Sequence, residues 1–435
     1  MKSCVFVLLC LVIPAFAQQS DSADSRFVKL HQNDSTDTRL DQRIAELQQQ
    51  ITELKEALHA KEEQDELERL LEEAQQLSVV KKDQKEGVGK KFHSGVRQQS
   101  GLNPNISLGG DFFAAVSSSK SDYISEPGSF SYGSNRFALR EIEVSLNAPL
   151  DPFTRGKSFI SFSGEGVEIE EAYMEWLNLP MKMNLKVGLF NAEFGALNRY
   201  HDHALPQFDR PSVLVHTFGN APLGGYGMSG NFLMHPMLFS DASSLDLSVL
   251  TGGGDVSFTS QGKYNLLYCG HWKNFYDLNQ DTYFEWSLSA VTGKNDPAEQ
   301  QWTTIGDLAF TLKWAPVGRS KYRTLEWKTE LLYSNRSTPG GDLEARGLYT
   351  SLQNKLNARY WVSARLGYAE LPYDPESSTW DVTGCFDVWQ SEFVFFRFQY
   401  QYSKRDFKLP GPYPDDHSFL FQVCWAMGPH KHEKY

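Results

Sequence analysis

Two histidines separated by one residue are among the side chains in this sequence that could bind a metal. His201 and His203 form an H-x-H pair within the segment 191–225, and Asp202 and Asp209 lie close to them. Imidazole nitrogens and carboxylate oxygens are ligands for divalent ions such as zinc. A lone H-x-H also occurs in ordinary polar loops, so two interpretations stay open. Either His201 and His203 bind a divalent metal, or they are polar loop residues and the chain has no cofactor.

The same segment, 191–225, carries charges that could act on ions. Arg199, Asp202, Asp209 and Arg210 lie close together in the sequence. Charged side chains at the narrow part of a pore set its ion preference, so these four are candidates for a channel constriction. Alternatively, the segment is a surface loop whose Arg–Asp pairs fix its own shape. Long loops are usually functional or disordered, and the apolar residues of this one disfavour disorder: Phe194, Phe208, Leu214, Val215 and Phe218.

Other kinds of chemistry find no support in the sequence. No G-x-S-x-G, H-E-x-x-H or GxxxxGK[ST] motif occurs, so we predict that the chain is not an enzyme. The net charge of -12 disfavours binding to nucleic acid. Cys269, Cys385 and Cys424 fall with His271 on the polar faces of predicted strands. We expect small buried residues there, with a metal cluster as the alternative.

The element that must position the segment 191–225 is a β-structure with long strands. From residue 103 onward, apolar and polar residues alternate, as in Thr324–Ser334, where Trp327 and Leu331 oppose Lys328 and Glu330. Such runs are about ten residues long, whereas strands of globular proteins average about five to six. Aromatic residues reach 13%. Long strands with one apolar face are typical of a transmembrane antiparallel β-barrel, in which the apolar face meets lipid.

The alternation predicts about sixteen strands, which is the size at which a barrel leaves an aqueous channel. Connections after odd-numbered strands are mostly long, including 116–135, 191–225 and 335–344, and those after even-numbered strands are short. This asymmetry is typical of outer-membrane barrels, whose short turns are periplasmic. The strands are predicted at 103–115, 136–148, 157–163, 167–177, 182–190, 226–235, 244–251, 263–273, 281–292, 302–315, 324–334, 345–356, 359–369, 379–389, 392–403 and 417–428.

The residues before the barrel have a different character. We predict a signal peptide at 1–17, with an apolar stretch and an A-x-A cleavage pattern, and a flexible segment at 18–37. Residues 38–80 carry apolar residues at alternating four- and three-residue steps, which predicts a periplasmic coiled coil. A single helix packed on another domain would show a similar stripe. Residues 81–102 form a charged linker, and the barrel would occupy 103–435.

The order of signal peptide, coiled coil and barrel resembles bacterial outer-membrane porins that are grouped with phosphate-selective porins O and P. The stretch Gly188–Asn198, followed by His201, His203 and Asp209-Arg210-Pro211, resembles a porin-like group in which some members are labelled zinc-regulated outer-membrane receptors. Porins of this kind are trimers, so the resemblance implies a homotrimer, although Ile and Leu in the seam favour two strands. Phosphate-selective porins have basic pores. Here residues 1–91 hold 13 of 42 basic and 17 of 54 acidic residues, which leaves the barrel region at 29 basic and 37 acidic, a net charge of -8.

Two functions from different classes follow from these observations. The first is a passive diffusion porin in the outer membrane of a Gram-negative bacterium, which transports small hydrophilic solutes or ions and is constricted by the loop 191–225. Net charge favours cations or neutral solutes over phosphate. The second is a structural or adhesive protein with a closed barrel, which is surrounded by outer-membrane lipids and is tethered to peptidoglycan through its coiled coil.

Overall fold

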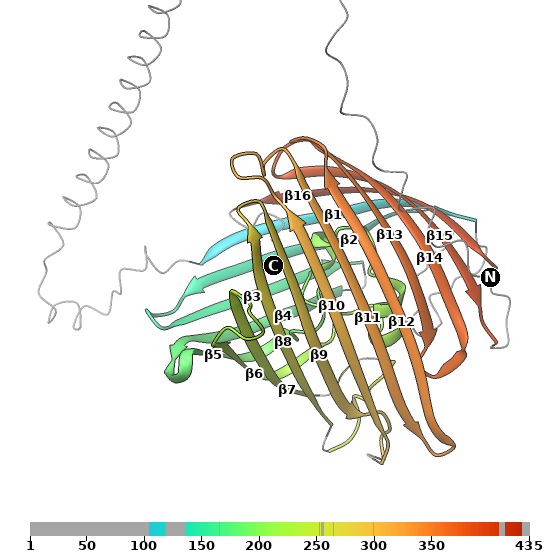
Figure 1. Cartoon of the computed structure of the whole chain (residues 1–435). Coiled ribbons are helices and arrows are strands. Elements are labelled where there is room, and N and C mark those ends of the chain that lie inside the picture. The colour runs from blue at the N-terminus through green and yellow to red at the C-terminus, as the bar shows by residue number, and fades with distance from the viewer. Residues whose placement is uncertain are drawn as a thin grey trace, which may run out of the picture. The chain divides into compact units, whose positions relative to one another are not determined.

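The computed structural model describes residues 104–118, 136–164, 166–251, 253, 256–263, 265–298, 300–408 and 414–428. Within these ranges the chain forms one closed barrel of antiparallel strands (Figure 1). The predicted signal peptide, flexible segment, coiled coil and linker lie outside the described residues. No helix in the described ranges is long and apolar enough to cross a membrane.

Each strand pairs with its neighbours in the sequence, and β1 pairs with β16 to close the barrel. The predicted sixteen-stranded antiparallel barrel is therefore confirmed. The strands are β1 (Asn105–Ser117), β2 (Arg136–Pro149), β3 (Thr154–Ser163), β4 (Gly166–Leu179), β5 (Met183–Asn191), β6 (Gly224–Met234), β7 (Ala242–Thr251), β8 (Leu266–Asn279), β9 (Thr282–Lys294), β10 (Trp302–Trp314), β11 (Thr324–Thr338), β12 (Gly341–Lys355), β13 (Tyr360–Leu371), β14 (Asp374–Trp389), β15 (Val394–Asp406) and β16 (Asp416–Met427).

The two faces of the barrel wall are inverted relative to a soluble protein. In β11, Trp327 is 50% exposed and Leu331 is 41% exposed, whereas Lys328 and Glu330 are buried inside the barrel. The same pattern recurs around the wall. An apolar outer face and a polar inner face is the arrangement that a lipid bilayer stabilises, because the sheet satisfies its own backbone and the lipid meets hydrocarbon side chains.

One predicted loop is wrong. We expected a long connection at 335–344, but β11 continues to Thr338 and β12 begins at Gly341. The hydroxyl of Thr338 donates to the carbonyl of Gly341 at 2.7 Å and closes the hairpin. Gly341 has a φ of 123°, which a side chain would rarely allow. The residues after Ser334 are polar on both faces, so their alternation was not visible in the sequence.

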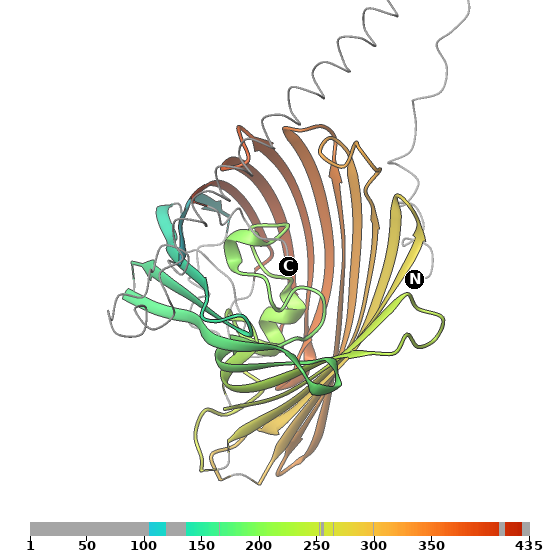
Figure 2. The same cartoon turned by 90° about the vertical axis from the view of Figure 1, so that its left-hand side faces the viewer.

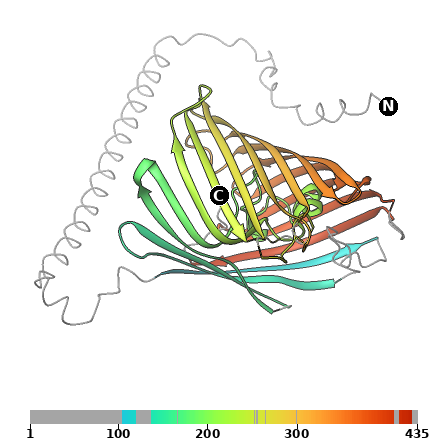
Figure 3. The same ribbon diagram turned by 90° about the horizontal axis from the view of Figure 1, so that it is seen from below.

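The connection between β5 and β6 lies inside the barrel. Figures 2 and 3 show this segment, residues 192–223, within the ring of strands, and we call it the luminal loop. It contains a short 3-10 helix, η5 (Asp202–Ala204), and one α-helix, α3 (Ser212–Phe218).

Apolar residues explain why the luminal loop packs against the wall instead of extending into solvent. Its buried side chains join wall residues such as Leu250, Leu267 and Ile305 in one hydrophobic cluster. Helix α3 approaches β12 so closely that a Cβ on Gly347 would lie 2.3 Å from Val213. Glycine at this position allows the close approach. The loop residues of the cluster are Ala192, Phe194, Leu197, Tyr200, Leu205, Val213, Leu214, Phe218 and Leu223.

Candidate functional site

The start of the luminal loop is held by one wall carboxylate. Glu330 of β11 accepts hydrogen bonds through Oε1 from the backbone N–H groups of Ala196 and Leu197, at 2.7 and 3.0 Å. The hydroxyl of Tyr349 donates to the same oxygen at 2.6 Å. The N–H of Gly195 donates to Ser289 Oγ on β9 at 2.9 Å. These bonds satisfy loop backbone that would otherwise be buried without partners.

Asp209, a predicted constriction residue, pairs with the opposite part of the wall. Its carboxylate lies 2.5 Å from Nη2 of Arg365 on β13 and accepts a hydrogen bond from Gln399 Nε2 at 2.6 Å. The Arg365 side chain is 0% exposed and that of Asp209 is 4% exposed. Asp209 therefore does not face open solvent; it forms a buried ion pair that ties the loop to β13 and β15.

Asp202 and Arg210, two further candidates, pair with each other and with the wall. Asp202 lies 3.0 Å from Arg210 Nη2 and 2.7 Å from Nη2 of Arg140 on β2. Burial alone would raise the pKa of Asp202, but the two guanidinium groups outweigh it and lower that pKa to about 2. Arg210 also donates to the carbonyl of Tyr200 at 2.5 Å. These charges fix the shape of the loop and hold it to β2.

Arg199, the fourth candidate, faces a cavity between the luminal loop and the wall formed by β8 to β11. Its guanidinium lies 2.6 Å from Glu193 Oε1. Burial would raise the pKa of Glu193, but Arg199 and Lys186 outweigh it and lower that pKa. The cavity has a volume of about 350 Å³ and is lined by Glu193, Phe194, Gly195, Ala196, Arg199, Tyr200, His271, Lys273, Tyr283, Glu285, Thr311, Lys313, Glu326 and Lys328.

The charges around this cavity are nearly balanced. Four basic and three acidic residues line it. Most of them are paired, since Lys313 lies 3.0 Å from Glu326, Lys328 contacts Glu326, and Lys273 lies 4.0 Å from Glu285. The cavity therefore presents positive and negative side chains next to one another.

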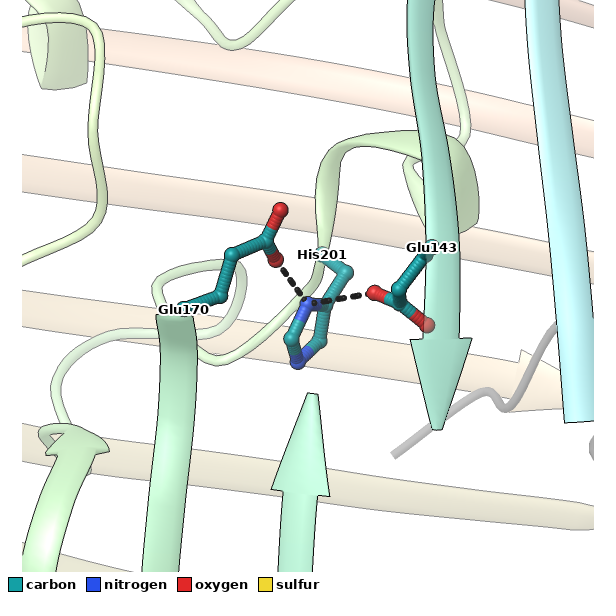
Figure 4. Close-up of side chains that lie close together, drawn as sticks. All are labelled: Glu143, Glu170 and His201. Carbon is teal, nitrogen blue, oxygen red and sulfur yellow. Dashed lines mark hydrogen bonds and ion pairs between the residues drawn. The ribbon is translucent and has the colours of Figure 1, made fainter. Parts of the chain in front are cut away.

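His201 meets a cluster of carboxylates on the β2 to β4 side of the barrel. Its Nδ1 lies 2.5 Å from Glu170 Oε2 and 3.1 Å from Glu143 Oε2 (Figure 4). Its Nε2 lies 3.2 Å from Glu171 Oε2. The ring rests on Phe159 of β3, with 4.6 Å between ring centroids. Burial would lower the pKa of His201, but the three carboxylates raise it well above its ordinary value.

His203 extends this cluster toward β1. Its Nδ1 lies 3.1 Å from Glu141 Oε1 and 3.8 Å from Glu143 Oε2. Burial would lower its pKa, but Glu143 and Glu141 raise it to about 9. The sequence placed both histidines near Asp202 and Asp209. The structure instead brings them to glutamates of the wall, while the two aspartates pair with arginines.

Two β-bulges place the side chains that meet η5. In the pairing of β3 with β4, Phe159 faces Glu171 and Ile160 faces Ile169, so Glu170 is the extra residue. In the pairing of β1 with β2, Asp111 faces Glu141 and Phe112 faces Leu139, so Arg140 is the extra residue. A bulge re-aims a side chain that regular alternation would send to the other face. Both extra residues reach the loop for this reason.

The glutamates were not among the predicted site residues. Glu141 and Glu143 alternate along a predicted strand, which is a signal that both face the lumen. Nothing in the sequence indicates that the luminal loop lies against this strand. The acidic run Glu168-Ile169-Glu170-Glu171 breaks the alternation, and that break is a signal for a bulge.

The three described cysteines are buried on the inner face, as expected, and none of them forms a disulfide. Cys269 donates to the carbonyl of Glu193 at 3.5 Å, and Cys385 donates to Gln399 Oε1 at 3.1 Å. His271 Nδ1 contacts Ser289 Oγ at 2.9 Å. These buried groups have separate partners, which is the arrangement of small packed luminal residues.

Comparisons with known sequences are sparse. No family model matches the chain. An uncharacterized protein of Aquifex aeolicus strain VF5 is 35% identical over 126 residues, which is 29% of this chain. The match spans 26% of that protein, so this chain covers about a quarter of its relative's length.

Comparisons with solved structures agree on the fold. OprB of Pseudomonas putida matches with a TM-score of 0.53 and 8% identity, over 77% of this chain and 97% of that one. The outer-membrane channel DcaP of Acinetobacter baumannii matches with a TM-score of 0.51 and 13% identity, over 75% of this chain and 97% of that one. An anion-selective porin from Comamonas acidovorans matches with a TM-score of 0.50 and 9% identity, over 74% of this chain and 100% of that one. The barrel has the porin fold.

Proposed function

We propose that the chain is an outer-membrane channel for the passive diffusion of small hydrophilic solutes or ions. One observation carries the proposal: a closed barrel with an apolar outer face and a polar interior encloses a cavity lined by charged side chains. Charged side chains on the inner face of a membrane-spanning barrel are typical of a lumen that contains water. The porin fold of the compared structures agrees with this function.

The luminal loop constricts the channel in this proposal. Its apolar residues pack against the inner wall from β7 to β13. The cavity lies between the loop and β8 to β11, so solutes pass on that side. Arg199 acts directly on solutes, because it faces the cavity. Asp202, Asp209 and Arg210 act indirectly, because their buried pairs keep the loop in place.

The selectivity that we propose is weak. The barrel region has a net charge of -8, which favours cations, but the cavity itself carries four basic and three acidic residues. An ion of either sign meets both attraction and repulsion there. Neutral and zwitterionic solutes fit this lining better than phosphate does.

The assembly of the protein follows the same proposal. The barrel lies in the outer membrane as a homo-oligomer, and the resemblance to coiled-coil porins implies a trimer. Residues 38–80 would form the coiled coil in the periplasm and would contact peptidoglycan. Kinship with the phosphate-selective porins or with the group labelled zinc-regulated receptors stays a prediction.

A second candidate function is a structural or adhesive protein with a closed barrel. The observation that favours it is the hydrophobic cluster between the luminal loop and the wall, which fills part of the interior. The two functions differ in whether solutes cross the membrane.

Liposome swelling separates the two functions. We expect vesicles that contain the full-length protein to swell in solutions of small neutral sugars, with rates that fall as the sugar becomes larger. Vesicles that contain heat-denatured protein serve as the control. A folded barrel that gives no swelling with any sugar would favour the structural function.

A further inference from the structure

Three potential ligand atoms converge on one point at the junction of the luminal loop and the wall. His201 Nδ1, Glu143 Oε2 and Glu170 Oε2 lie within 4.8 Å of one another (Figure 4). Tetrahedral zinc with bonds of about 2.0 to 2.2 Å holds its ligand atoms about 3.4 Å apart. The distances from His201 Nδ1 to the two carboxylates, 2.5 and 3.1 Å, are slightly shorter than this spacing. Small side-chain adjustments would admit an ion.

The second nitrogen of His201 has the partner that metal-binding histidines usually have. Its Nε2 lies 3.2 Å from Glu171 Oε2, and the other oxygen of Glu171 accepts a hydrogen bond from the N–H of Asn191 at 2.8 Å. Such a carboxylate fixes the tautomer that carries the proton on Nε2 and directs the lone pair of Nδ1 toward the metal. In that tautomer, the Nδ1 lone pair faces two carboxylates. Only a proton or a cation between them makes this arrangement favourable.

We propose that His201, Glu143 and Glu170 bind one divalent metal ion, with His203 as the fourth ligand, and that the ion ties the luminal loop to β2 and β4. His203 Nδ1 lies 3.8 Å from Glu143 Oε2 and would move toward the other three ligand atoms when the ion binds. Two imidazoles and two carboxylates suit zinc better than the hard ions calcium and magnesium, which prefer oxygen ligands alone.

The backbone of β3 and β4 helps to form this site. The bulge in β4 leaves Glu170 without a cross-strand partner and allows both Glu170 and Glu171 to reach one imidazole ring. Phe159 supports the face of the same ring. Because β2 and β4 are separated by β3, an ion between Glu143 and Glu170 bridges the wall as well as the loop. Binding does not require that the barrel conducts.

Zinc titration of the full-length protein, freed of metal by a chelator, tests the proposal. A second H-x-H at His430 and His432 lies outside the described residues and could bind zinc by itself. All variants are therefore made in a parent that carries His430→Gln and His432→Gln. We expect this parent to bind one zinc ion per chain by calorimetry. Glu170→Gln and His201→Gln should each weaken binding by at least about tenfold, since even outer-shell partners of a metal contribute tenfold or more.

Matched substitutions separate the site from general effects on the surface. Glu168→Gln makes the same change on the same strand at an exposed position, and His235→Gln removes an exposed histidine. Both should bind zinc as the parent does. Cobalt bound to the parent should show the visible absorption of a tetrahedral site with nitrogen ligands, which needs no variant. The proposal is overturned if the parent binds no zinc, or if Glu170→Gln and Glu168→Gln bind it equally well.

Discussion

Replacing Asp209 with alanine is expected to release the luminal loop from the wall and to raise the conductance of the barrel. Arg365 is fully buried, and Asp209 is its nearest carboxylate, at 2.5 Å. Asp381, its other acidic neighbour, lies 3.5 Å away. Removing one partner of a buried ion pair typically costs about 3 to 5 kcal/mol, because the remaining charge stays buried. We expect the free energy of unfolding to fall by about this amount, measured by denaturant titration in lipid.

Two further variants isolate this ion pair. Asp342→Ala removes an exposed aspartate that accepts a hydrogen bond from Ser337, and it should leave conductance and stability nearly unchanged. Adding Arg365→Met to Asp209→Ala should recover part of the stability, because the buried guanidinium that lost its nearest carboxylate is removed. The recovery should be incomplete, because Asp381 then loses its cation neighbour. The loop should still be loose in this double variant, so the channel should stay more conductive than the wild type. Equal conductance in all four proteins would contradict the constricting role of the loop.

Reversing two lysines of the cavity should make the channel select cations. Lys273→Glu with Lys313→Glu would change the lining from four basic and three acidic residues to two basic and five acidic ones. A unit charge about 5 Å from an ion in water contributes about 0.8 kcal/mol, or about a fourfold change in local concentration. We expect the cation-to-anion permeability ratio to rise at least about fourfold, as measured by reversal potentials under a salt gradient.

The salt dependence and a matched control strengthen this test. The Debye length falls from about 10 Å at 0.1 M to about 3 Å at 1 M, so the change in selectivity should shrink at high salt. Lys182→Glu with Lys321→Glu makes the same change of charge in the connections after β4 and β10. That variant should keep the selectivity of the wild type. If it shifts selectivity as much as the cavity variant does, ions do not pass along the β8 to β11 side.

The barrel could be predicted because its cause is local. Strict alternation, as in β11, places Trp327 toward lipid and Lys328 toward the lumen whatever the rest of the chain does. Several predicted strand boundaries differ from the structure where both faces of a strand become polar, as after Ser334. At such ends only the hydrogen-bonded register defines the strand. The pattern of apolar residues does not predict this register.

The contacts of the luminal loop could not be predicted, because its partners are distant in sequence. Asp209 pairs with Arg365, and the N–H of Leu197 donates to Glu330. These contacts exist only once the barrel has closed around the loop. The sequence marked the loop and its charged residues, but it did not separate Arg199, which faces the cavity, from Asp209, which is buried.

The glutamates of the candidate metal site depend on a second non-local feature. Regular alternation would place Glu170 and Glu171 on opposite faces of β4, with one of them toward lipid. The bulge opposite Phe159 brings both to His201. Predicting the site from sequence would require the position of the bulge and the side of the barrel on which the loop rests.

Single-channel conductance of the refolded full-length protein in a planar lipid bilayer tests the central claim most directly. The account predicts discrete steps, weak selectivity between cations and anions, and steps in multiples of three if the protein is a trimer. Steps of the Asp209→Ala variant should be larger. A folded, heat-modifiable barrel that inserts into the bilayer and passes no current would contradict the account and would leave the structural function in its place.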